Sequence, residues 1–125
     1  MSSTSTTSRP GPIVLRGKPM DADSHHQILV PPMRTQTLVA VRGWATGYGD
    51  PAAGANATAD LALAVNGANV GKVHESNFTL YNLEVEHRFL LAANTAATID
   101  LTYSNHVATE AGDPAHGVIA TVSAV

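Results

Sequence analysis

Residues 81–86 of this chain, YNLEVE, alternate apolar and polar side chains with a period of two. In an extended strand, such alternation turns Tyr81, Leu83 and Val85 to one face and the polar residues between them to the other. A helix is a poor alternative, because the two glutamates lie only two positions apart and the alternation continues over several residues. The segment therefore predicts a half-buried β-strand.

The same period recurs along most of the chain, in segments 37–42, 61–65, 99–103 and 118–123. Both faces of 37–42 are fairly apolar, which predicts a central strand. With the shorter apolar segments 13–15, 28–30 and 70–73, roughly eight strands follow one another at short spacing. No segment has the pattern of an amphipathic helix, and short strands must bury their apolar faces against a second sheet. The predicted fold is all-β, a two-sheet antiparallel β-sandwich of jelly-roll or Greek-key type.

Turn residues divide these strands. Asn66-Gly67 favours positive φ at both central positions and predicts a hairpin, with Gly71 as a β-bulge in its return strand. Residues 47–57 are rich in Gly and Ala and predict a long loop, and Pro31-Pro32 forms a joint before the main body. The Ser/Thr-rich residues 1–12 predict a flexible or extended N-terminal arm, followed by one sandwich domain over 13–125.

The composition excludes several classes of function. The 125-residue chain has a net charge of −3, which argues against a nucleic-acid binder with a basic surface. No apolar run approaches the ~20 residues that cross a bilayer, and the N-terminus lacks the pattern of a secretory signal. The chain has no cysteine, so thiolate metal sites, disulfides and cysteine nucleophiles are excluded.

Candidate chemical sites are weak. His25 and His26 are adjacent, so in a strand they point to opposite faces, and we interpret them as part of a polar turn leading into residues 27–30. The other histidines are scattered without ligand spacing. Asp50 and Asp113 each lie in a Gly-Asp-Pro turn, which supplies one carboxylate where calcium needs 6–8 oxygens. We therefore expect no catalytic residue, no metal, no cofactor and no enzymatic activity.

Surface composition is more informative. Charged residues make up 14% of the chain, against about 25% in typical globular domains. Thr, Ser, Asn and Ala occupy the outward positions of the predicted strands. A surface with few charges has little to desolvate when another protein covers it, and depletion of charge is typical of interface cores. The sequence therefore predicts a protein that functions in an assembly.

The Ser/Thr-rich arm Met1–Pro12, the joint Pro31-Pro32, and the strands Leu61–Val65, Tyr81–Val85 and Ile99–Tyr103 together resemble the cement or decoration proteins of tailed bacteriophages. The resemblance lies in overall character and in no diagnostic motif. It implies a homo-oligomer, dimer or trimer, on the virion exterior, assembled in the host cytoplasm and bound to a major capsid protein or another structural protein. A tail or baseplate location, or a bacterial protein that is cytoplasmic or secreted without a signal, stays open.

On this interpretation, the partner-binding residues lie in the arm and near the joint. Arg9 and Arg16 are the expected charged anchors, since guanidinium groups pair bidentately with carboxylates. The full predicted set is Arg9, Pro10, Ile13, Leu15, Arg16, Pro31, Pro32 and Arg34.

An alternative function is a lectin-like, carbohydrate-binding module. Trp44 and Tyr48 flank a glycine-rich turn that continues to Asp50, and aromatic faces with polar neighbours are typical of sugar sites. The competing interpretation, which we favour for a chain with a single tryptophan, is that Trp44 fills the core at the end of its strand.

Overall fold

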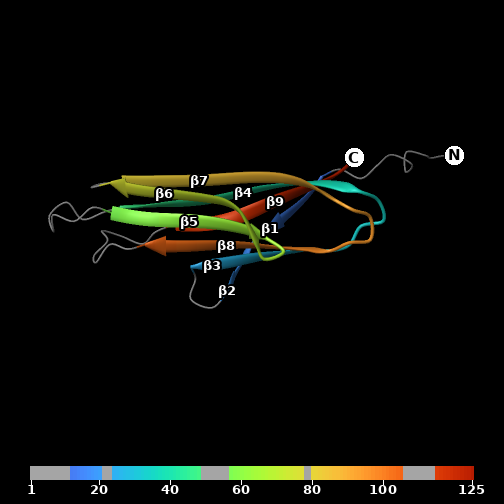
Figure 1. Cartoon of the computed structure of the whole chain (residues 1–125), viewed down its shortest axis with the longest axis horizontal. Coiled ribbons are helices and arrows are strands. Elements are labelled where there is room, and N and C mark those ends of the chain that lie inside the picture. The colour runs from blue at the N-terminus through green and yellow to red at the C-terminus, as the bar shows by residue number, and fades with distance from the viewer. Residues whose placement is uncertain (1–11, 21–23, 49–56, 78–79, 106–114) are drawn as a thin grey trace.

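The computed structural model describes residues 12–20, 24–48, 57–77, 80–105 and 115–125. Within these ranges every regular element is a strand, and the strands form two antiparallel sheets packed face to face (Figure 1). The all-β sandwich predicted from the sequence is confirmed. The strands are β1 (Ile13–Arg16), β2 (Lys18–Met20), β3 (His25–Val30), β4 (Thr37–Tyr48), β5 (Ala57–Val65), β6 (Ala68–Asn77), β7 (Leu80–Leu91), β8 (Ala97–Asn105) and β9 (Ala115–Ala124).

The first sheet has four strands in the order β1-β9-β4-β7, and the second has five in the order β2-β3-β8-β5-β6. β4 pairs with β7 over all twelve of its residues and with β9 over Thr37–Thr46. It is thus a central strand, as its two apolar faces predict. Among the described residues, no helix is long and apolar enough to cross a membrane.

The core fills the space between the sheets with aliphatic side chains from alternate strand positions. Fully buried Leu61, Leu63, Ile99 and Leu101 of the five-stranded sheet face Val39 and other small residues of the four-stranded sheet. Among the described residues, Tyr103 is the one aromatic residue in this buried cluster, as the low aromatic content leads one to expect. The inward sets predicted at 99–103 and at 118–122 are confirmed.

The hairpin between β5 and β6 turns at Asn66-Gly67, where both residues have positive φ, 51° and 84°. The turn is tied to β8, because the Asn66 N–H donates to the Thr98 carbonyl oxygen (2.8 Å) and the Thr98 N–H donates to Asn66 Oδ1 (2.9 Å). The register shifts in this hairpin, so that Val70 is the extra residue of a bulge beside Gly71. The hairpin and the bulge follow the sequence prediction, but β6 is longer than the expected return strand.

Two segments differ from the sequence prediction. β2, residues 18–20, was not expected, and β3 begins at His25 where a polar turn was predicted. β3 starts at His25 because it pairs with β8 from His25↔Thr102 onward, and β2 exists because it pairs in turn with residues 25–27 of β3. Of the predicted loop 47–57, both ends belong to strands, while residues 49–56 lie outside the described residues.

Replacing Gly67 with alanine tests the hairpin. No atom lies within 4 Å of a Cβ placed at Gly67, so the substitution introduces backbone strain at positive φ without a steric clash. We expect Gly67→Ala to lower the free energy of unfolding by about 1 kcal/mol, measured by urea denaturation. Ala92→Ser, at an exposed position outside the turn, is the control and should unfold like the wild type. A Gly67→Ala variant as stable as the control would contradict the strain argument.

Candidate interaction surface

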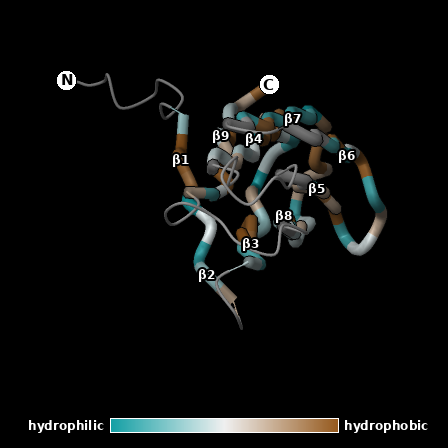
Figure 2. Tube along the Cα trace, turned by 90° about the vertical axis from the view of Figure 1, so that its left-hand side faces the viewer, coloured by the Kyte–Doolittle hydropathy of each residue, from teal (hydrophilic) through white to brown (hydrophobic). Residues whose placement is uncertain are grey.

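One side of the sandwich stays open because the chain changes sheets there. β1 ends at Arg16, the Gly17 N–H donates to the Val118 carbonyl oxygen (2.9 Å), and the next residues join the other sheet as β2. On the opposite side β6 lies against β7, with Gly71 beside Val85. Figure 2, which looks along the strands, shows β1 and β2 on one side of the molecule and β6 on the other.

A groove of about 370 Å³ lies on the open side, where the three short strands β1, β2 and β3 meet. Its walls are mostly apolar. The lining residues are Leu15, Arg16, Lys18, Met20, Gln27, Ile28 and Leu29. We call the surface formed by β1, β2, β3 and this groove the β1–β3 edge.

Exposed apolar side chains gather at the β1–β3 edge. Among the described residues, six large hydrophobic side chains are exposed, and four of them belong to these strands: Ile13 (41%), Val14 (53%), Met20 (37%) and Leu29 (67%). Scattered exposed hydrophobic residues need no explanation, but an apolar patch is typical of an interaction site, and Met20 and Leu29 both line the groove. The β1–β3 edge is therefore the strongest candidate interaction surface on the described part of the chain.

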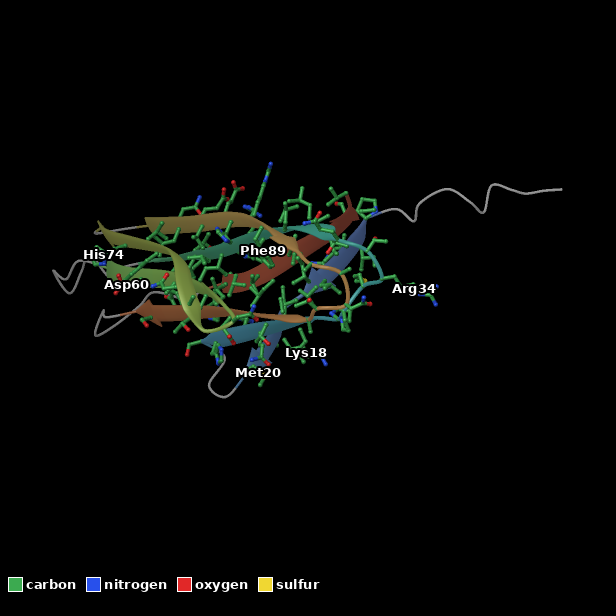
Figure 3. All side chains as sticks on the ribbon, turned by 45° about the vertical axis from the view of Figure 1, so that its right-hand side comes forward. Lys18, Met20, Arg34, Asp60, His74 and Phe89 are labelled. Atoms are coloured by element: carbon green, nitrogen blue, oxygen red, sulfur yellow. The ribbon has the colours of Figure 1, made fainter. Side chains whose placement is uncertain are left out.

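The groove is also cationic. Arg16 and Lys18 line it and are exposed, and none of its lining residues carries a carboxylate. Asp100 lies on β8, the strand next to β3. On the outer face of the five-stranded sheet, its carboxylate accepts hydrogen bonds from His25 Nε2 (2.9 Å) and Gln27 Nε2 (3.0 Å). Figure 3 shows Lys18 and Met20 together at the β2 edge of the molecule. An apolar groove with two cations thus lies on a chain whose net charge is negative.

The predicted partner-binding residues are partly brought together. Ile13, Leu15 and Arg16 all lie on β1 at this edge. Pro31, Pro32 and Arg34 are exposed in the connection from β3 to β4, at the end of the sandwich where β1 begins (Figure 1). Arg9 and Pro10 lie outside the described residues. Met20 and Leu29 were missed: Leu29 lies two residues before the Pro31-Pro32 joint, but the exposure of both side chains depends on the pairing of β2 with β3.

The histidines are arranged differently from the sequence interpretation. His25 and His26 point to opposite faces, as expected, but in a strand and not in a turn. His26 is buried, and its Nε2 lies 2.6 Å from Nδ1 of His116, whose ring stacks on Tyr103 with 4.7 Å between centroids. Sequence reasoning missed this pair, although both histidines continue inward-facing alternating patterns.

Two further imidazoles, those of His74 and His25, each pair with a carboxylate. His74 Nδ1 lies 2.5 Å from Asp60 Oδ1, on neighbouring strands β6 and β5 (Figure 3). His25 pairs with Asp100 on a different part of the same sheet. Among the described residues, no three His, Cys, Asp or Glu side chains are grouped closely enough to hold a metal ion. The His74–Asp60 and His25–Asp100 contacts each link two neighbouring strands of the five-stranded sheet.

Trp44 lies on the outer face of the four-stranded sheet, so the expectation that it completes the core is wrong. Its neighbours in β4 are the buried Gly43 and Ala45, and Trp44 between them turns outward and covers Gly117 of β9. The Arg42 guanidinium carbon lies 5.6 Å from the centre of the indole. Arg42 Nε donates to Glu84 Oε2 (3.0 Å), and this hydrogen bond and the charge of Glu84 raise the pKa of Arg42 above its ordinary value.

A second hollow, of about 210 Å³, lies beside Trp44 and is also lined by Arg16, His26 and His116. Of the other two residues of the predicted sugar site, the side chain of Tyr48 and all of Asp50 lie outside the described residues. Of the predicted sugar site, the structure therefore describes only the side chain of Trp44. It is half-buried on the outer face of its sheet, beside polar groups that the sequence did not associate with it.

No family model and no curated protein matches the sequence of this chain. Among solved structures, it is similar to dimeric latent PorU from Porphyromonas gingivalis, with a TM-score of 0.58 and 11% identity, over 90% of this chain and 12% of that one. It also has a TM-score of 0.47 and 14% identity with the mosquito-larvicidal Cry4Aa toxin from Bacillus thuringiensis, over 82% of this chain and 18% of the toxin. The similarity to PorU concerns the fold alone.

Gly117→Ala tests the packing of Trp44 on β9. A Cβ at this position would lie 2.8 Å from Cζ2 and 3.0 Å from Cη2 of the indole, so the ring must move away from the sheet. We expect a loss of about 1–3 kcal/mol in unfolding free energy and a red shift of the emission of this single tryptophan. Ser123→Ala, also on β9, is the control and should leave the emission unchanged. An unshifted emission in Gly117→Ala would show that Trp44 does not rest on Gly117.

Proposed function

We propose that this chain is a structural interaction protein that attaches to another protein through its β1–β3 edge. The observation that carries the proposal is the groove itself, whose lining includes the exposed apolar Met20 and Leu29 and two cations but no carboxylate. Covering apolar area contributes roughly 25 cal/mol per Å² before the costs of association. The sparse charge of the surface keeps the desolvation cost of such a contact low.

The strand orders support the architecture expected of such a protein. β2 only extends the five-stranded sheet beyond β3. Without it, the sandwich consists of two four-stranded sheets that face each other, in the orders β1-β9-β4-β7 and β3-β8-β5-β6. Along the chain, every connection passes from one sheet to the other except the β5–β6 hairpin and the short β2–β3 link. This connectivity favours a jelly roll, a fold that occurs in viral capsid proteins and in lectins.

The resemblance to phage decoration proteins gives the proposal its biological setting. In this setting the partner is a major capsid protein or another structural protein, and the site of action is the outer surface of a virion. The chain would act as a dimer or trimer. Its role would be binding and stabilisation of the shell, with no catalytic step.

A carbohydrate-binding module is the second candidate, and one observation favours it. Trp44 is half-buried and borders a hollow that also contains Arg16, His26 and His116, so an apolar ring lies beside hydrogen-bonding groups. Screening the purified chain and its Trp44→Ala variant on a glycan array separates the two functions. A decoration protein should bind no glycan, whereas a lectin should bind as an isolated domain and lose binding on removal of the indole.

Reversing both groove cations tests the proposed surface. We expect Arg16→Glu with Lys18→Glu to weaken cosedimentation with shells assembled from the major capsid protein by roughly tenfold, because attraction to partner carboxylates becomes repulsion. Lys72→Glu, at the exposed lysine of β6 on the opposite side, is the matched control. Thermal melts should confirm that both variants fold. Equal cosedimentation of the groove variant and wild type, or an equal loss in Lys72→Glu, would refute the proposed surface.

A further inference from the structure

The backbone of β1 has an open edge. Successive residues of an antiparallel strand alternate between bonding to one neighbour and facing the other side. The Gly17 N–H bonds to Val118, and the register continues from this pair, so Leu15 and Ile13 also bond to β9. Val14 and Arg16 consequently direct their N–H and C=O groups away from β9. Within the described ranges, no strand pairs with them on that side.

The same reasoning applies to β3 across the groove. The Ser24 carbonyl oxygen accepts a hydrogen bond from the Tyr103 N–H (2.7 Å), and Thr98 bonds to Asn66 on the other side of β8. In this alternation Leu29, opposite Thr98, directs its backbone groups away from β8 and toward the β2 side, at a position that β2 does not reach because it starts at Lys18 opposite Gln27. Two strand edges whose outward backbone groups have no partner strand in the described part of the chain therefore border one groove.

We propose that β1 accepts an added strand from the partner protein, and that this strand alternates apolar residues with carboxylates. The inference rests on the proposed interaction function and specifies its chemistry. Added residues opposite Ile13 and Leu15 would share their inward orientation, so their side chains would enter the groove beside Ile28 and Leu29. Residues opposite Val14 and Arg16 would point outward, and a carboxylate there would lie beside the Arg16 guanidinium.

Strand addition uses each feature of this edge. Hydrogen bonds to the main chain of Val14 and Arg16 supply affinity, and the groove selects the side chains of the added strand. Lys18, which lines the same groove, adds a second positive charge. Apolar side chains alone would leave these two cations next to a dry contact without a counter-charge, which is costly. The charge of the groove thus favours an acidic segment.

A different protein suits the edge better than a second copy. The acidic alternating strand of this chain is β7, but its Leu83 and Val85 are buried in its own core. Its Glu84 is already paired with Arg42. In a copy of β7, the exposed Leu90 lies on the same face as Glu84 and Glu86, whereas the added strand needs its apolar residues and its carboxylates on opposite faces.

Val14→Pro removes one outward N–H without touching the β1–β9 ladder, and proline is tolerated on an edge strand when its missing N–H faces outward. The probe is an acetylated, amidated heptapeptide that alternates valine and glutamate, titrated into the full chain by NMR. In the wild type, it should slow hydrogen exchange at the amides of Val14 and Arg16. In Val14→Pro the affinity should fall by roughly tenfold, whereas Val14→Thr, which keeps the N–H, should bind like the wild type.

Two further peptides complete the test. A version N-methylated on alternate backbone amides should bind weakly, and one with lysine in place of glutamate should not bind. Equal binding of the N-methylated peptide or of Val14→Pro would overturn strand addition, and the N-methylated peptide decides the matter if the proline variant does not fold. Self-association that protects the same two amides would replace the partner with a second copy and refute the inference.

The two proposals fail in distinguishable ways. If the double charge reversal at Arg16 and Lys18 weakens shell attachment but Val14→Pro does not, the interaction surface stands and strand addition is wrong. If neither variant affects attachment, both are wrong.

Discussion

Gly17 is the position on which the open side of this molecule depends. Its N–H is bonded to Val118, and a Cβ there would lie 2.3 Å from Val118 Cγ1 and 3.2 Å from His26 Cβ. The chain therefore passes between the sheets at the closest approach that the packing permits. Because the passage occurs here, β1 ends at Arg16, β2 has three residues, and the ends of both β1 and β3 face a groove in place of a neighbouring strand.

The treatment of the strand edges follows from the same topology. Exposed edges invite pairing with other chains, and lysine on an edge strand is a common protection. The only two lysines of this chain, Lys18 and Lys72, lie on β2 and β6, the two edges of the five-stranded sheet. The sequence shows that lysines are scarce, but only the strand order shows that both are at edges. β1, an edge of the other sheet, instead presents Ile13 and Val14.

Period-two alternation predicts which side chains face inward, because the faces of a strand depend on local geometry alone. It placed Ile99, Leu101 and Tyr103 correctly, and the Asn66-Gly67 turn was equally local. The pairing of His26 with His116 could not be predicted from the sequence, because residues 90 positions apart meet only through the arrangement of β3 and β9 across the sandwich.

The outward position of Trp44 was misjudged for a related reason. Hydrophobicity favours burial of a single tryptophan, but the core beside β4 is already filled by Leu101 and its neighbours, and the indole finds its partner in the bare backbone of Gly117. The candidate site was predicted only in part. Its β1 residues followed from the sequence, whereas the groove needs β2, a strand that exists only through its pairing with β3.

The pairing of charges elsewhere on the sandwich explains why the groove cations stand apart. Glu84 is occupied by Arg42, and Asp100 by His25 and Gln27. Arg16 and Lys18 have no ion pair with any described carboxylate. Exposed charges interact over about 8–10 Å at physiological salt. The two cations therefore attract carboxylates of a partner at the open edge more strongly than they interact with distant charges of their own chain. Among the described residues, the side with unpaired backbone groups is thus also the side where two cations have no ion pair, and an acidic strand satisfies both.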